Sequence, residues 1–168
     1  NISFNSDIKI TDTLVSTGSV TLGGDVYIDT VSNLLQSSGG VIYSNNEGKD
    51  GYIIACGMMV PFAVEACKQL RAEGIDCGVI DMHTIKPLDK ELVYKAAEKS
   101  GKIVTCEDAF IIGGLGGAVC ECVAESGIPC KVKRLGVPDL FPGFGSFDEQ
   151  MKNLGFGVEA MKEAIKSL

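Results

Sequence analysis

The sequence predicts a three-layer α/β/α domain with a mainly parallel sheet, preceded by a short β-rich segment. Apolar runs that end at a glycine, such as 52–56, are typical of strands buried on both faces. These runs alternate with amphipathic stretches and short loops, which favours right-handed βαβ units with helices on both faces of the sheet. The composition also changes near Gly40, where a stretch rich in Ser, Thr, Asn, Asp and Gly ends. We therefore expect a β-rich segment over 1–39 and an α/β domain over 40–168.

The first segment has apolar residues in strict alternation, as in Ile8 and Ile10 and again in Val20 and Leu22. That period predicts short half-buried strands separated by turns. An isolated hairpin is only marginally stable in water, so such strands need neighbours. The role of 1–39 stays open between a fibre-like segment and an oligomerisation module.

The α/β domain begins with a strand over 52–56 that stops at Gly57. A helix follows, with Pro61 in its first turn, where the missing N–H costs no hydrogen bond, and Gly74 at its end. The next strand is expected over 75–81, because its apolar residues are again followed by a polar loop.

Asp89 is a favoured N-cap for a second helix. This helix is expected to run to Lys99 or Ser100, with Gly101 just past its end. A third strand is then expected over 102–106.

A glycine-rich loop over 113–117 leads into a helix that ends at Gly127, and 131–137 reads as the fourth strand. The stretch 146–149 has the Ser-x-x-Glu pattern of a capping box and should open a short helix. Apolar residues at helical spacing predict a last helix over 158–168.

Composition excludes several classes of protein. The formal net charge is −7, which argues against binding to nucleic acid. No apolar run approaches the roughly 20 residues that span a bilayer, so no membrane segment is expected. The seven cysteines are odd in number, include no Cys-x-x-Cys pair and mostly lie in apolar runs. They are expected to be free thiols in a cytoplasmic protein, and no metal site is expected.

Candidate site residues lie where strands end, because ligands of such sheets bind at the carboxyl ends of strands. Four glycines before the third helix could offer backbone N–H groups to an anion: Gly113, Gly114, Gly116 and Gly117. We favour the other explanation, that they allow the helix to pack closely on the sheet. Four polar residues are expected to face a neighbouring domain: His83, Lys86, Glu107 and Asp108. His83 has no partner at a recognised catalytic spacing, and no catalytic residue is expected.

Four ordered segments resemble the C-terminal domain shared by transketolases, deoxyxylulose-phosphate synthases and the β subunits of 2-oxoacid dehydrogenases. The segments are 47–57, 79–89, 103–116 and 134–141, and the resemblance covers about residues 40–168. The stretch Asp-Met-His-Thr-Ile-Lys-Pro-Leu-Asp at 81–89 is most similar to the split transketolases of bacteria and archaea. Ala109 departs from the pattern, because many relatives have a histidine there.

The resemblance implies a non-catalytic domain that packs on a pyrimidine-binding domain and helps to form a dimer. The whole enzyme would transfer ketol units between sugar phosphates, with thiamine diphosphate and Mg²⁺ bound by other domains or subunits. Gly24-Asp25 and Asn45-Asn46 only partly match the diphosphate motif, so this chain alone is expected to bind no cofactor and to be inactive. Two alternatives remain: a fibre or oligomerisation module fused to an α/β domain, and a binding domain for a small anionic ligand.

Overall fold

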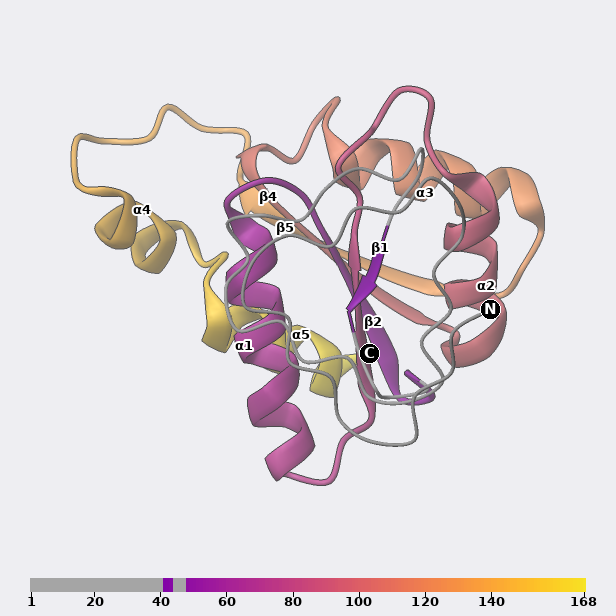
Figure 1. Ribbon diagram of the computed structural model, residues 1–168. Helices are drawn as coiled ribbons and strands as arrows, with labels where there is room; N and C mark the ends of the chain where they lie inside the picture. The colour runs from indigo at the N-terminus through magenta and orange to yellow at the C-terminus, as the bar shows by residue number, and fades with distance from the viewer. Residues whose placement is uncertain (1–40, 44–47) are drawn as a thin grey trace, which may run out of the picture.

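The predicted three-layer α/β/α architecture is confirmed by a computed structural model, which describes residues 41–43 and 48–168 (Figure 1). The predictions for 1–39 lie outside the described residues. The sheet has five strands: β1 (Val41–Tyr43), β2 (Gly51–Ala55), β3 (Cys77–Asp81), β4 (Lys102–Phe110) and β5 (Lys131–Val137). The helices are α1 (Met59–Ala72), α2 (Lys90–Ser100), α3 (Leu115–Ser126), α4 (Phe147–Leu154) and α5 (Val158–Ser167).

The strand order is β1-β3-β2-β4-β5, and β2 to β5 are parallel. Ile53 of β2 lies opposite Val79 of β3 and Val104 of β4, so the most apolar strand is at the centre. All five residues of β2 are buried, as a strand covered on both faces requires. The short β1 pairs antiparallel with β3, through Val41 opposite Asp81. Only three residues long, β1 has no periodic signal that sequence reasoning could use.

Two hydrophobic cores lie on the two faces of the sheet. Helices α1 and α5 cover one face, where Leu70, Val104 and Met161 are fully buried. Helices α2 and α3 cover the other face, and there Ile54 and Val119 are fully buried. Figure 1 shows the first pair of helices to the left of and below the sheet and the second pair to its right.

The predicted helix ends are largely confirmed. The Asp89 side chain accepts a hydrogen bond from the Leu92 amide at 3.0 Å, and Gly101 ends α2 in the left-handed conformation. Ser146 and Glu149 form the predicted capping box of α4. Each cap satisfies backbone groups that a helix end leaves without a partner. These signals act within a few residues, which is why the sequence reveals them.

Two elements differ from the predicted bounds by more than two residues. Strand β4 continues four residues beyond Cys106, because Phe110 pairs with Val137 after an irregularity in the ladder. Helix α3 starts at Leu115, so Gly116 and Gly117 belong to the helix and not to the loop. Both differences extend regular secondary structure at the carboxyl edge of the sheet.

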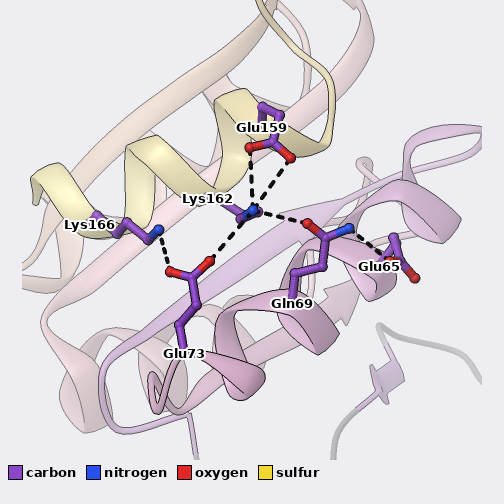
Figure 2. Close-up of polar contacts among 6 residues, drawn as sticks. All are labelled: Glu65, Gln69, Glu73, Glu159, Lys162 and Lys166. Atoms are coloured by element: carbon purple, nitrogen blue, oxygen red, sulfur yellow. Dashed lines mark hydrogen bonds and ion pairs between the residues drawn. The ribbon is translucent and has the colours of Figure 1, made fainter.

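A polar seam, defined here as Glu65, Gln69 and Glu73 of α1 with Glu159, Lys162 and Lys166 of α5, joins the two helices (Figure 2). The Lys162 ammonium lies 2.9 Å from Gln69 Oε1, 3.3 Å from Glu159 and 3.5 Å from Glu73. Its side chain is only 13% exposed. Lys166 forms a second ion pair with Glu73. A network of this kind orients α5 against α1 around the apolar contacts beneath it.

The ion pairs of the seam predict that Glu73 contributes to the free energy of unfolding and that this contribution is lost at acid pH. The hydrogen bond from Lys166 lowers the pKa of Glu73, with partial burial opposing it. The contribution is therefore complete above the unfolded-state pKa and lost as the pH falls through the lower, folded-state value. Glu73→Gln should lower the free energy of unfolding near neutral pH and have no effect at the acid end. Denaturant unfolding across this range, with Glu98→Gln on α2 as the control, measures the difference; a pH-independent difference would contradict the assignment.

Candidate docking surface at the carboxyl edge of the sheet

The carboxyl edge of the sheet carries an unusual set of exposed apolar side chains. We define the carboxyl-edge surface as these residues: Met58, Ile85, Phe110, Ile112, Leu140, Phe141 and Phe144. They are all of the large hydrophobic residues that are exposed among the residues the structure describes. Met58 follows β2, Ile85 follows β3, and the others lie at or beyond the ends of β4 and β5. Because carboxyl ends of parallel strands meet at one edge, the strand ends and loops that carry these residues share one side of the domain, at the top of Figure 1.

The loop after β5 contributes the most exposed members of this surface. Phe141 and Phe144 are fully exposed, and Leu140 is 46% exposed. The loop projects from the body of the domain with α4 at its end (Figure 1). It is held at its far end by the Gln150 side-chain amide, which donates to the Gly143 carbonyl at 2.7 Å. Phe147 of α4 packs against Phe62 and Phe156 and attaches the helix to the domain.

A shallow hollow lies on this surface between the ends of β4 and β5. It is lined by Phe110, Ile112, Asp139, Leu140 and Phe141. Four of these five side chains are apolar, and Asp139 contributes the one carboxylate. The hollow is open to solvent, unlike an enclosed small-molecule site.

The glycine loop is organised by Glu107, a buried residue that is 1% exposed. Its carboxylate accepts hydrogen bonds from the Leu115 amide at 2.9 Å and the Gly116 amide at 2.8 Å. These are amides at the start of α3, where unpaired N–H groups and the helix dipole favour a negative group. A protein carboxylate therefore occupies the place that the sequence suggested for an anion. Binding of an external anion by the four glycines stays a prediction.

Close packing explains two of these glycines. A Cβ at Gly114 would lie 1.8 Å from Oε2 of Glu107, and a Cβ at Gly116 would lie 2.8 Å from the Thr105 hydroxyl oxygen. No such contact arises at Gly117, whose Cβ would meet nothing within 4 Å in the described part of the chain. Thr105 is fully buried, and its hydroxyl has no hydrogen-bond partner among the residues that the structure describes. The glycines thus allow α3 to start directly against β4.

The segment between β4 and α3 is tied to β5 as well. The Arg134 guanidinium donates to the Ile111 carbonyl at 2.7 Å, and the Ile111 amide donates to the Val137 carbonyl at 3.0 Å. A Cβ at Gly136 would lie 2.9 Å from the Ala109 carbonyl oxygen and 3.0 Å from Glu107 Cγ. Residues 110–114 are consequently fixed at both ends.

The other candidate polar residues lie at the same edge. His83, Lys86 and Asp108 are exposed, and His83 Nδ1 lies 2.8 Å from the Thr84 hydroxyl. Sequence reasoning missed the apolar members of the surface. The available signal was the run Leu140-Phe141-Pro142-Gly143-Phe144, in which the loop-forming pair Pro-Gly separates apolar residues.

All seven cysteines are free thiols, and four of them are buried: Cys67, Cys77, Cys106 and Cys122. Burial raises the pKa of Cys56 to about 11, and the charges of Glu107 and Asp108 add to the shift. Burial also raises the pKa of Cys106, whose thiol donates to the Phe156 carbonyl at 3.2 Å. A protonated thiol is a poor nucleophile and a poor metal ligand, so this chemistry favours a structural role.

The described residues do not fit the diphosphate and Mg²⁺ of thiamine diphosphate. Across 41–43 and 48–168, no three His, Cys, Asp or Glu side chains lie together as a metal site would need. At the start of α3, the Leu115 and Gly116 amides already donate to Glu107. Within the same described ranges, no helix is long and apolar enough to cross a membrane.

Comparison with known proteins agrees with this geometry. A family profile described as "Transketolase, C-terminal domain" matches residues 40–161. The chain belongs to the transketolase C-terminal domain family. This membership confirms the resemblance read from the four sequence segments.

Curated relatives of this transketolase C-terminal domain are enzymes or enzyme subunits. It is 38% identical over 122 residues to the 1-deoxy-D-xylulose-5-phosphate synthase of Heliobacterium modesticaldum, covering 73% of this chain and 19% of that protein. It is 41% identical to the 6-deoxy-6-sulfo-D-fructose transketolase subunit SqwH of Clostridium sp. strain MSTE9, and the match covers 72% of this chain and 36% of that subunit. A putative transketolase C-terminal section of Methanocaldococcus jannaschii is 41% identical, and the match covers 71% of this chain and 37% of that protein. The domain therefore spans less than two fifths of each of these relatives.

A solved structure described as "Split gene transketolase, inactive beta4 tetramer" superposes with a TM-score of 0.73 at 35% identity. The match covers 86% of this chain and 46% of that one. A Campylobacter jejuni transketolase shares the fold, with a TM-score of 0.58 at 18% identity.

Proposed function

We propose that this chain is a non-catalytic C-terminal domain of a transketolase-type enzyme, and that its carboxyl-edge surface docks on a pyrimidine-binding domain. The observation that carries the proposal is the exposed apolar set on the loops after β2 to β5. Monomeric soluble proteins rarely expose more than a few hundred Å² of continuous apolar surface, and larger patches mark interaction sites.

The composition of the surface supports a protein partner. Aromatic residues and methionine are enriched in the centres of protein interfaces, whereas a polar rim surrounds them. Phe141 and Phe144 would form the centre, and His83, Lys86 and Asp108 would belong to the rim. The part of each relative that this domain does not match is long enough to include such a partner domain.

Catalysis is proposed to reside in the rest of the enzyme. Thiamine diphosphate and Mg²⁺ would be bound by the pyrimidine- and diphosphate-binding domains or subunits, which would transfer ketol units between sugar phosphates. The complete enzyme is proposed to be a cytoplasmic dimer or higher homo-oligomer. The free thiols of all seven cysteines support a reducing compartment. The relative described as an inactive tetramer supports the need for a second kind of subunit.

Two measurements test the proposal. Calorimetry of the 168-residue chain with thiamine diphosphate and Mg²⁺ should show no saturable binding, and the chain alone should show no ketol transfer. A labelled chain should bind saturably to the part of the Clostridium SqwH subunit outside the matched region. Cofactor binding or ketol transfer by the chain alone, or failure of this association, would overturn the proposal.

A further inference from the structure

We propose that Glu107 is a positioning residue for partner docking: its buried carboxylate acts as an internal anion that fixes segment 110–114, and with it Phe110 and Ile112, in the shape that the partner recognises. The inference rests on the proposed docking function. It assigns a role to a residue that cannot touch a partner directly, because it is 1% exposed.

The carboxylate acts on the end of the segment that joins α3. Its two oxygens each accept one backbone N–H, from Leu115 at 2.9 Å and from Gly116 at 2.8 Å. Charge-assisted hydrogen bonds of this kind are stronger than neutral ones, and both donors would otherwise be buried without a partner. Glu107 itself is anchored in β4, so the start of α3 has one fixed position relative to the sheet.

The other end of the segment is fixed by β5. Ile111 exchanges two hydrogen bonds with that strand, from its amide to the Val137 carbonyl and to its carbonyl from Arg134. Between these ties, Phe110 is 49% exposed and Ile112 is 61% exposed. A pre-formed segment binds more tightly, because the partner need not order it on association.

The test removes the Glu107 carboxylate by substitution and then supplies a free carboxylate, formate, from solution. Glu107→Ala leaves two N–H donors facing a space of carboxylate size, and Glu107→Asp keeps the charge. Exchange of the Leu115 and Gly116 amides in the 168-residue chain, followed by NMR, should be at least about tenfold faster in the alanine variant. Added formate should slow this exchange again, whereas equal chloride should not. Glu98→Ala, which removes an exposed carboxylate on α2, should show no effect of either salt.

Docking is measured on the same proteins with the part of SqwH outside the matched region as the probe. We expect binding at least about tenfold weaker for Glu107→Ala, recovered in part by formate and by Glu107→Asp. If the alanine variant does not fold, Glu107→Gln fills the space without charge and should bind less tightly, with no response to formate. Unchanged binding in the variants, or no formate effect on exchange, overturns the positioning role. A wild-type chain that fails to bind overturns the docking function instead, whatever the exchange result.

Discussion

Replacing Phe141 and Phe144 together by serine is expected to weaken association with the partner domain by about a hundredfold. Central aromatic residues carry much of the energy of an interface, and a loss of about 1.4 kcal/mol for each ring gives this factor. Both side chains are fully exposed in the isolated chain, so folding does not depend on them. Substitutions at such positions change the free energy of unfolding by no more than about 0.5 kcal/mol.

Titration of the labelled double variant with the partner domain measures this effect, and thermal unfolding checks stability. Ala72→Ser serves as the control, because Ala72 is exposed at the opposite end of α1. Equal affinity of the double variant and the wild-type chain would show that the loop after β5 lies outside the interface. A large drop in melting temperature would mean that the two rings pack within their own domain.

Gly114→Ala is expected to destabilise the domain by about 2–4 kcal/mol, from overpacking together with loss of a buried charge-assisted hydrogen bond. The added Cβ would lie 1.8 Å from Glu107 Oε2 and 2.9 Å from the Phe110 carbonyl oxygen, and the carboxylate is held by the Leu115 and Gly116 amides. The backbone at Gly114 has φ −98°, so conformational strain adds nothing to the effect.

Gly117→Ala is the matched control three residues later. Its Cβ would meet nothing within 4 Å across 41–43 and 48–168, and Gly117 lies inside α3. Alanine should therefore stabilise the domain by about 0.5–1 kcal/mol through its higher helix propensity. Denaturant unfolding of both variants gives the comparison. If Gly114→Ala were as stable as the wild-type chain, the contact between Glu107 and α3 would be wrong.

Much of the fold could be predicted because its signals are local. Asp89, Gly101 and Ser146 each cap a helix within a few residues, and each acts as the sequence indicated. The strand over 131–137 was predicted with its exact bounds, since a proline and a lysine-rich alternating run limit it. The three-residue β1 carries no such signal, and its place at the edge depends on pairing with β3.

The candidate site could be predicted only in part. Sequence reasoning singled out both Glu107 and the glycines of 113–117, yet their contact depends on how β4 and α3 approach each other in three dimensions. It also placed Glu107 among residues that face another domain, whereas the structure buries it. The exposed aromatic residues were missed because composition alone does not distinguish a phenylalanine in a loop from one in the core.

Hydrogen exchange of the 168-residue chain, alone and with the partner domain, tests the docking surface most directly. The partner should protect the loops after β2, β3, β4 and β5, and should leave α1, α5 and the start of β5 unchanged. Segment 110–114 and the loop that carries Phe141 should show the largest protection. Protection confined to the α1–α5 face or to the free edge of β5, with none at the carboxyl edge, would contradict the account.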